Sequence, residues 1–458
     1  MSTNNLSICK HYLGNKIHFI SLGCPRNLVD SEIMLGILLK AGYEVTENIF
    51  SADYLILNTC AFLKAARKES IENLIEMINK KKATAKIILT GCLVSKHKKE
   101  LAPLLPHVHY LLGSGDIDSI LRVISSDSKG FQFSAKSFLE IGEVPRKLST
   151  PKHYAYLKIA EGCRKRCSFC IIPQIKGPLI SKTIEQIKKE FLGLLKQGVL
   201  EIILIAQDLG DYGKDLSLDN KTSQLTYLLK ELLSIKGNYW LRLLYLYPDE
   251  VDQALIDLMK SDSRLLPYID MPIQHINDDI LKHMNRKTSG KQIKQTIKLL
   301  KQELPHIKIR TSIIVGYPGE TSKHFEELSS FLQEFKLDNV GFFAYSQEEG
   351  TPAAKALNQV SEKEKQLRLN KLAALQKKVV ETSNSKLIGK HFEVIVEGYH
   401  PDSNLLLTGR YYGQSPEIDG CIILNDWKKV KTFSKRYLVK ITGVIGYDLL
   451  GTVIKSIV

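Results

Sequence analysis

The sequence predicts an α/β protein made of three successive domains: a parallel α/β domain, a partial barrel of six β/α units, and a small antiparallel β-barrel. Strand–helix alternation on two length scales predicts the first two, over residues 1–130 and 153–388. Over residues 389–458, short strands follow one another with only turns between them, which is typical of a small barrel. A chain of 458 residues also fits about three domains at roughly 150 residues each.

In the first domain, repeated strand–helix–strand patterns predict a parallel sheet that is covered by helices. Residues 131–152 contain no long periodic segment, and we interpret them as a linker. The predicted strands are Ile17–Leu22, Tyr54–Asn58, Lys86–Thr90 and Val108–Leu112, and the predicted helices are Ser31–Lys40, Ala65–Lys80 and Ser95–Leu101.

The second domain repeats the alternation with longer helical stretches and ends in a charged helix, Ser361–Lys386. Six β/α units are too few for the closed eight-stranded barrel but suit an open, partial one. The predicted strands are Tyr156–Ala160, Glu201–Ala206, Leu241–Leu246, Tyr268–Met271, Lys308–Val315 and Asn339–Tyr345.

The composition is that of an ordinary globular protein, with 44% hydrophobic and 25% charged residues. No run of 18 apolar residues occurs, and the first residues are too polar for a signal peptide, so we expect a cytoplasmic protein with no membrane partner. The net charge of +15 favours a polyanionic partner such as RNA or a ribosome, although a generally lysine-rich proteome accounts for it equally well. In a reducing compartment, eight cysteines indicate metal binding or catalysis more than disulfides.

Three cysteines lie close together in EGCRKRCSFCIIP: Cys163, Cys167 and Cys170 have the spacing C-x3-C-x2-C directly after the first strand of the second domain. Three thiolates on one tight loop can hold three corners of a cubane iron–sulfur cluster and leave the fourth iron open for a ligand. A zinc knuckle with a distant fourth ligand is the structural alternative. The loop begins at the carboxyl end of a barrel strand, where barrel active sites lie.

A second triplet, Cys24, Cys60 and Cys92, follows the first three strands of the parallel sheet at intervals of about one βα unit. Parallel strands place their carboxyl ends on one edge of the sheet, so these three thiols should converge there. Three unrelated buried cysteines are the alternative interpretation. Cys9 and Cys421 share no such pattern, and we interpret them as structural.

These features together resemble a known family. The C-x3-C-x2-C loop is similar to that of the radical S-adenosylmethionine superfamily, and the three-cysteine domain before it and the small, TRAM-like barrel behind it resemble the methylthiotransferases. The motifs HYAYLKIAEGC, LIAQD, DMPIQH, VGYPGET, YSQEEGTPA and SPEIDG resemble the RimO type, which methylthiolates the β-carbon of an aspartate in ribosomal small-subunit protein twelve. The related MiaB type modifies a tRNA adenosine.

The resemblance implies two [4Fe–4S] clusters and S-adenosylmethionine as cofactors. The cluster on the 163–170 loop would bind S-adenosylmethionine and cleave it to a 5′-deoxyadenosyl radical, while the protein orients the reactants. The second cluster would carry or supply sulfur, and a second S-adenosylmethionine would supply the methyl group. It also implies an electron donor such as flavodoxin or ferredoxin, a basic ribosomal protein as substrate with ribosomal RNA nearby, and a monomeric enzyme.

Polar residues follow successive strands of the second domain, and such residues surround one site at a barrel mouth. Each alone could equally be a loop cap or a turn residue. Phe169 could pack beside the adenine or shield the cluster, and His275 could carry a proton or be structural. The candidate cofactor-binding residues are Phe169, Gln207, Asp208, Gln274, His275, Gly316, Glu320 and Ser346, with Pro248, Asp249, Pro318, Gly319, Glu348 and Glu349 at the same strand ends.

The chain departs from the family pattern after Cys170, where Lys176, Ile180 and Lys182 stand at positions at which the family suggests arginines. Lysine keeps the charge but loses the bidentate geometry, and isoleucine loses both. This puts a basic contact there in doubt.

The last domain bears on the substrate, because residues 391–458 hold eight Lys and Arg against seven Asp and Glu. A barrel that grips RNA phosphates should be clearly basic, so we favour a basic protein partner and take Glu417 and Asp419 of SPEIDG as docking residues. A simple turn is the alternative for SPEIDG. A tRNA-modifying enzyme and a non-enzymatic RNA-binding module with structural or redox-sensing clusters remain the competing functions.

Overall fold

The computed structural model describes residues 14–96, 98–133, 139 and 145–457. The chain forms two compact units, Met1–Lys147 and Leu148–Val458, and we describe each by itself. Cys9 and much of the predicted linker 131–152 lie outside the described residues. Within the described part of the chain, no helix has the length and apolar character that crossing a membrane requires.

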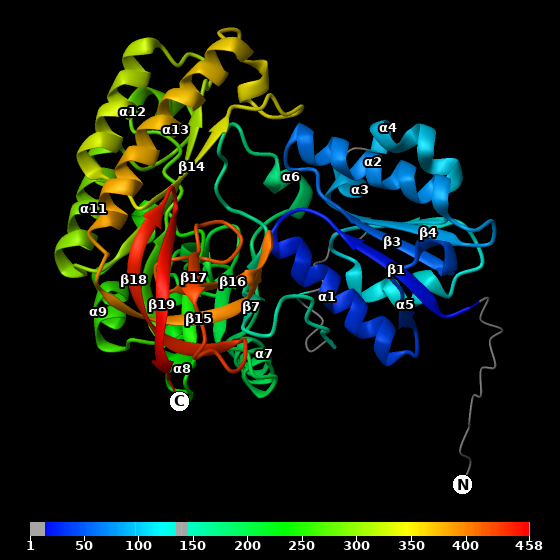
Figure 1. Cartoon of the computed structure of the whole chain (residues 1–458). Coiled ribbons are helices and arrows are strands. Elements are labelled where there is room, and N and C mark those ends of the chain that lie inside the picture. Colours follow the sequence, from blue (N-terminus) through cyan, green and yellow to red (C-terminus); the bar gives the residue numbers. More distant parts are fainter. Residues whose placement is uncertain (1–13, 97, 134–138, 140–144, 458) are drawn as a thin grey trace. The chain divides into compact units, whose positions relative to one another are not determined.

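The first unit is a six-stranded parallel sheet with helices on both faces, as predicted (Figure 1). The side chains of β3 and nearly all of those of β4 are buried, which explains their continuous apolar sequences. The predicted helix Ser95–Leu101 is wrong in its bounds, and the strand β6 falls where we expected the linker to begin. In spatial order the strands are β2 (Glu44–Val45), β1 (Lys16–Ser21), β3 (Tyr54–Thr59), β4 (Lys86–Gly91), β5 (Tyr110–Leu112) and β6 (Gly130–Gln132), and the helices are α1 (Pro25–Lys40), α2 (Lys64–Lys80), α3 (Cys92–Lys96), α4 (Lys98–Leu101) and α5 (Ile120–Ile124).

The second unit contains an open sheet of six parallel strands in chain order, which confirms the predicted partial barrel fold. Amphipathic helices bury leucines, isoleucines and phenylalanines against this sheet in one continuous core. The strands are β7 (Tyr154–Lys158), β10 (Glu201–Ile205), β11 (Trp240–Leu243), β12 (Leu265–Asp270), β13 (Lys308–Val315) and β14 (Asn339–Ala344), and the helices are α7 (Ile184–Lys196), α8 (Leu225–Leu233), α9 (Gln253–Ser261), α10 (Asp278–His283), α11 (Gly290–Glu303), α12 (Ser322–Phe335) and α13 (Glu362–Ser385).

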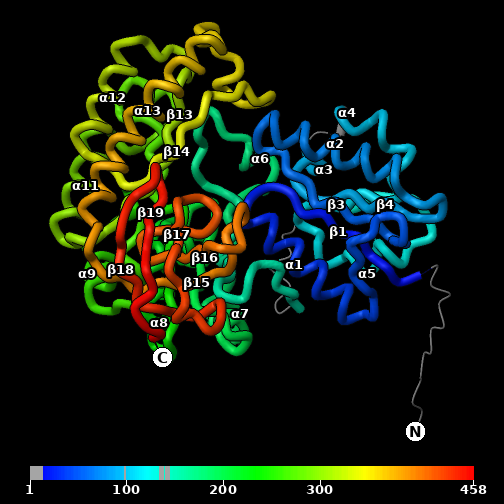
Figure 2. The backbone as a smooth tube through the Cα atoms, in the orientation of Figure 1, coloured from blue at the N-terminus to red at the C-terminus, as the bar shows by residue number. Residues whose placement is uncertain are grey.

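The last strands of the chain form a closed five-stranded barrel within the second unit. Its pairings are antiparallel except for one parallel pairing between β17 and β19. Figure 2 shows these strands, orange to red, against the green strands of the open sheet. They are β15 (His391–His400), β16 (Ser403–Tyr411), β17 (Ile422–Asp426), β18 (Lys435–Ile445) and β19 (Asp448–Ser456).

The loop of residues 415–420, which carries SPEIDG, joins this barrel to the open sheet. The hydroxyl of Tyr154 on β7 donates to Glu417 at 2.7 Å. Asp419 accepts from Tyr268 of β12 at 2.6 Å and from Arg310 of β13 at 2.9 Å. The Asp419 side chain is only 1% exposed and holds this loop against the open sheet. Partner docking by Glu417 and Asp419 stays a prediction. Glu417 is exposed, and its carboxylate accepts from the hydroxyls of Tyr154 and Tyr156.

A buried ion-pair network continues this junction. Glu201, at the start of β10, is fully buried between Arg242 of β11, at 2.5 Å, and Arg410 of the barrel, at 2.9 Å. These two guanidinium groups hold the pKa of Glu201 below its ordinary value against the opposing effect of burial. The carboxy-terminal barrel therefore supplies charges that the open sheet needs.

Candidate active site

The first cysteine triplet lies on the loop between two short strands, β8 (Ala160–Glu161) and β9 (Ile180–Ser181), which pair antiparallel and close it. Gly162 starts this loop with φ of +80°, and a Cβ there would lie 1.8 Å from the Pro178 carbonyl oxygen, so only glycine fits. The amide of Cys163 donates to the Gly177 carbonyl at 3.3 Å, and that of Cys170 donates to the Cys167 carbonyl at 3.0 Å. The local sequence thus folds all three cysteines into one short turn.

The electrostatics of this loop suit a metal centre. Burial, with a smaller contribution from the neighbouring Cys170 and Cys167, raises the pKa of the Cys163 thiol to about 12. Thiols that repel one another as thiolates need a nearby cation before they ionise together, and bound iron provides it. Three thiols on one loop are also the donor set of an iron–sulfur cluster with one open corner, so the residues present fit that group.

A cluster of charged side chains flanks the loop, centred on Lys165. Its ammonium lies 2.9 Å from Glu250, 3.3 Å from Asp208 and 3.6 Å from Asp211. Burial raises the pKa of Asp208 to about 7, and Asp211 and Glu250 raise it while Lys165 opposes them. Lys165, Asp211 and Glu250 line a hollow of about 450 Å³ that also reaches Cys167. The loop is therefore set beside a charged, partly enclosed space.

Of the polar residues that the structure describes at the strand ends, Gln207 keeps a free acceptor, while others already have partners within the chain. The Gln207 side-chain oxygen is buried with no hydrogen-bond partner in the described structure, so it is available to a ligand. Gln274 has φ of +70° and bridges to β13 through its backbone, while Phe169 packs beside the small apolar cluster of Tyr317 and Tyr345. The Ser346 hydroxyl donates to Glu348 at 2.5 Å. Cofactor binding by Phe169, Gln207, Asp208, Gln274 and Ser346 stays a prediction.

Glu320 has a structural task in the folded chain, and cofactor binding by Glu320, Gly316 and His275 stays a prediction. Its carboxylate is fully buried and accepts from Arg368 of α13 at 2.5 Å and from the Gly316 amide at 2.9 Å. His275 is also fully buried, and its Nδ1 accepts from the Asn277 amide at 3.0 Å. Burial lowers the pKa of His275 to about 3, so the imidazole is neutral at physiological pH. These groups hold the loops after β12 and β13 in place.

The residues that depart from the family pattern are engaged within the chain. Lys176 pairs with Glu161 at 2.5 Å, and Lys182 pairs with Glu190 at 2.5 Å. Ile180 pairs with Glu161 across β8 and β9. Both lysines thus stabilise the base of the cysteine loop.

The second cysteine triplet lies in the first unit, where three parallel strands end. Cys24 precedes α1, Cys60 directly follows β3, and Cys92 opens α3 after β4. A Cβ at Gly23 would lie 2.7 Å from the Cys60 sulfur, so the chain passes close to that thiol. Burial raises the pKa of Cys60, and Cys24 adds to the effect. The topology brings these strand ends to one edge of the sheet.

Neutral hydrogen bonds support this second triplet. Asn58 donates to the Asn27 carbonyl at 2.9 Å and to the Ser31 hydroxyl at 2.8 Å. The Ser70 hydroxyl accepts from the Cys60 amide at 3.1 Å and donates to the Cys60 carbonyl at 3.0 Å. These side chains tie the strand ends to α1 and α2 without a buried charge at either bond.

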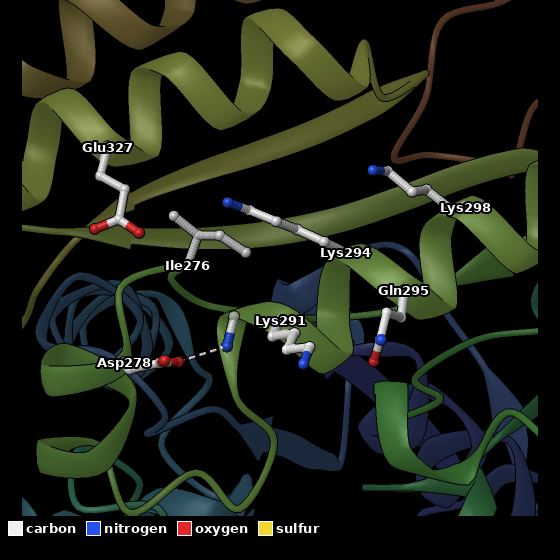
Figure 3. Close-up of a pocket in the computed structure, with 8 residues that line it drawn as sticks. Ile276, Asp278, Lys291, Lys294, Gln295, Lys298 and Glu327 are labelled. Carbon is white, nitrogen blue, oxygen red and sulfur yellow. Dashed lines mark hydrogen bonds between the residues drawn. The ribbon is translucent and has the colours of Figure 1, made fainter.

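A separate hollow of about 430 Å³ lies between α10, α11 and α12 (Figure 3). Lys291, Lys294 and Lys298 project from α11, and none has a carboxylate within 4.0 Å among the described residues. Asp278 accepts from the Gly290 amide, and Glu327 accepts from Asn277. The lysines on this face therefore have no ion-pair partner.

Comparison with known proteins gives three matches along the chain: residues 16–113 to the uncharacterized protein family UPF0004, 157–332 to the radical SAM superfamily, and 388–454 to the TRAM domain. The chain is 63% identical over 442 residues to a protein of Chlamydia felis, covering 96% of each chain. It is 57% identical to one of Protochlamydia amoebophila, covering 99% of this chain and 95% of that one, and 42% identical to one of Bdellovibrio bacteriovorus, covering 96% and 97%. All three are named ribosomal protein uS12 methylthiotransferase RimO.

The chain belongs to the RimO family. The predicted resemblance is confirmed, and these relatives support the ribosomal-protein methylthiotransferase over the tRNA-modifying type. A solved radical S-adenosylmethionine methyltransferase, TsrM from Kitasatospora setae, superposes with a TM-score of 0.55 at 14% identity, covering 74% of this chain and 77% of that one. At this low identity, the likeness shows only that the two chains share a fold.

Sequence reasoning about this RimO-family chain missed the side chains that surround the first triplet. They lie in loops with no diagnostic spacing, and only the pairing of β10 to β12 brings those loops together. An aromatic residue before Pro248 and a lone arginine after α10 carry no signal of their own. The missed residues are Lys165, Asp211, Tyr247, Glu250 and Arg286.

Proposed function

We propose that this chain methylthiolates the β-carbon of an aspartate in ribosomal protein uS12, replacing a C–H bond by a C–S–CH3 group. The observation that carries this proposal is a sequence identity of 57% and 63% to two RimO proteins over nearly the full length of the chain. The two cysteine triplets support it, because a methylthio transfer needs both radical chemistry and a sulfur carrier. The second candidate, a tRNA methylthiotransferase, has less support, since the carboxy-terminal barrel has nearly balanced charge.

In this proposal, Cys163, Cys167 and Cys170 hold one [4Fe–4S] cluster, and Cys24, Cys60 and Cys92 hold the other. The first cluster, when bound, supplies the electron that cleaves S-adenosylmethionine, and a small redox protein is its electron donor. The chain's own residues orient the reactants: Gln207 offers a buried, unpaired acceptor at the end of β10, which suits the amino group of the cofactor. Lys165 and the carboxylates that surround it, Asp208 and Glu250, provide charged groups beside the cysteine loop.

The function can be tested with purified enzyme, reconstituted anaerobically and supplied with a reductant and S-adenosylmethionine. Ribosomal protein uS12 and tRNA are offered side by side and then digested for mass spectrometry. We expect the methylthio mass shift on one aspartate of uS12 and unmodified adenosines. Methylthio-adenosine with unmodified uS12 would replace this proposal by the tRNA reaction. Cys421→Ala is the matched control and should leave the product unchanged, because Cys421 directly precedes β17 of the barrel and belongs to neither triplet.

We also propose that the lysine-bearing face of α11 contacts ribosomal RNA near the substrate protein. Its three lysines lack acidic partners and face outward from the open sheet. Changing Lys291, Lys294 and Lys298 to Gln should weaken binding to the small ribosomal subunit a few-fold and reduce its salt slope by about one per lost phosphate contact. Binding measured at several salt concentrations tests this. An unchanged slope would place the RNA contact elsewhere.

A further inference from the structure

A buried arginine lies against the first cysteine triplet. Nη1 of Arg286 is 3.9 Å from the Cys167 sulfur, and Nη2 donates to the Pro272 carbonyl. Its guanidinium carbon lies 3.9 Å from the centroid of the Tyr247 ring, and the Tyr247 hydroxyl is 3.3 Å from the same sulfur. Arg286 is only 8% exposed. Two polar groups from different loops thus converge on one thiol.

In the described part of the chain, no carboxylate oxygen lies within 4.0 Å of this guanidinium, and Asp249 acts on it only from a greater distance. A buried cation without a counter-charge is strongly unfavourable, so an anion is expected beside it. The other buried arginines of this unit show the usual solution. Arg242, Arg368, Arg410 and Arg436 each have a carboxylate within 3.0 Å.

Cys167 is the group that can provide the missing negative charge, as a thiolate and as part of a cluster. An arginine cannot lose its proton in a protein, so its charge stays in place whatever the cluster's oxidation state. A fixed cation at this distance stabilises an added electron by simple Coulomb attraction in a buried setting. Donors near a cluster's sulfur atoms are among the features by which a protein changes its reduction potential.

We propose that Arg286 and Tyr247 form a positioning pair that holds the Cys167 ligand and raises the reduction potential of the cluster on the 163–170 loop. The inference rests on the proposed function, because it requires that cluster. One electron passes from an external one-electron reductant to the cluster, which is reduced from the 2+ to the 1+ state, and the reductant is oxidised by one electron. No proton moves, because the arginine stays protonated.

The test is a potentiometric titration of the full-length chain, followed by electron paramagnetic resonance. Cys24, Cys60 and Cys92 are changed to Ala so that the signal comes from one cluster. In Arg286→Gln, we expect the ratio of reduced to oxidised cluster at a fixed potential to fall about tenfold, which is a midpoint about 59 mV lower. Tyr247→Phe should shift the midpoint in the same direction by less, and Arg286→Lys should keep most of the wild-type potential.

Arg264→Gln is the matched control. Arg264 also stacks on a tyrosine, with its guanidinium carbon 5.0 Å from the Tyr239 ring, but it precedes β12 at the amino ends of the strands. Its substitution should leave the midpoint unchanged. If Arg286→Gln fails to fold or to hold iron, the Tyr247→Phe midpoint decides.

Unchanged midpoints in Arg286→Gln and Tyr247→Phe, at wild-type iron content, would overturn the inference while the proposed function stands. An unchanged midpoint with weaker binding of S-adenosylmethionine would overturn it too, and would assign Arg286 to the cofactor. No iron in the parent variant would overturn the proposed cluster and this inference together.

Discussion

The two cysteine triplets are built by different means. Cys163, Cys167 and Cys170 lie within eight residues of one loop, so a local turn brings them together. Charged side chains surround them. Cys24, Cys60 and Cys92 are spread over three strand–helix units, so only the parallel sheet gathers them. Their supports are neutral amide and hydroxyl groups. The first site should therefore respond to charge and pH, and the second to the register of the sheet.

The largest expected effect comes from removing the loop triplet. Changing Cys163, Cys167 and Cys170 to Ala should reduce the iron from about eight to about four atoms per chain after anaerobic reconstitution. Cleavage of S-adenosylmethionine should fall to background, because radical generation needs this loop. Iron analysis and quantification of 5′-deoxyadenosine measure both effects. Eight irons in this variant would show that the loop holds no cluster.

Removing the strand-end triplet should separate the two roles. The variant with Cys24, Cys60 and Cys92 changed to Ala should also retain about four irons and still cleave S-adenosylmethionine. It should transfer no methylthio group, which mass spectrometry of uS12 detects. Normal transfer would remove the sulfur-carrier role, and loss of cleavage would show that the two sites are more tightly coupled than we propose.

A smaller effect tests the neutral network of the first unit. Asn58→Leu removes two buried donors and leaves the Asn27 carbonyl and the Ser31 hydroxyl with one bond fewer. It should cost about 1–3 kcal/mol in the free energy of unfolding and lower the iron content of the strand-end site. Cleavage of S-adenosylmethionine should stay at the wild-type rate. Asn73→Ala, which loses only an exposed hydrogen bond, should change stability by less than about 0.5 kcal/mol.

The smallest expected effect concerns pH at the loop site. The pKa of Asp208 is about 7 in the folded chain, raised by burial from 3.8. The folded state then binds a proton that the unfolded state has released, so stability falls as pH rises from about 4 to about 7. We expect a gradual loss of about 1.4 kcal/mol per pH unit within this range, and Asp208→Asn should remove it. Denaturant titrations at several pH values measure the slope; the same slope in both proteins would exclude Asp208 as its source.

Much of this organisation can be predicted from the sequence, because it follows from periodicity. The strand positions, the two cysteine triplets and their placement at strand ends agree with the structure. Side-chain partners that depend on tertiary packing could not be predicted. The contact between Arg286 and Cys167 depends on how the loop after α10 packs against the cysteine loop. In the same way, the turn sequence around Asp419 suggests an exposed side chain, and only the fold places Arg310 beside it.

The loop 415–420 has a consequence for how this protein can be altered. Asp419 of this loop and Arg410 of the barrel form ion pairs with Arg310 and Glu201 of the open sheet. A chain cut before residue 388 would leave Glu201 without Arg410 and Arg310 without Asp419, at a newly exposed surface. If the last domain were exchanged for that of a relative, the residues of the new barrel and of the open sheet would have to form equivalent ion pairs. Transfer of the carboxy-terminal barrel alone to another chain should therefore break the ion pairs that join it to the open sheet.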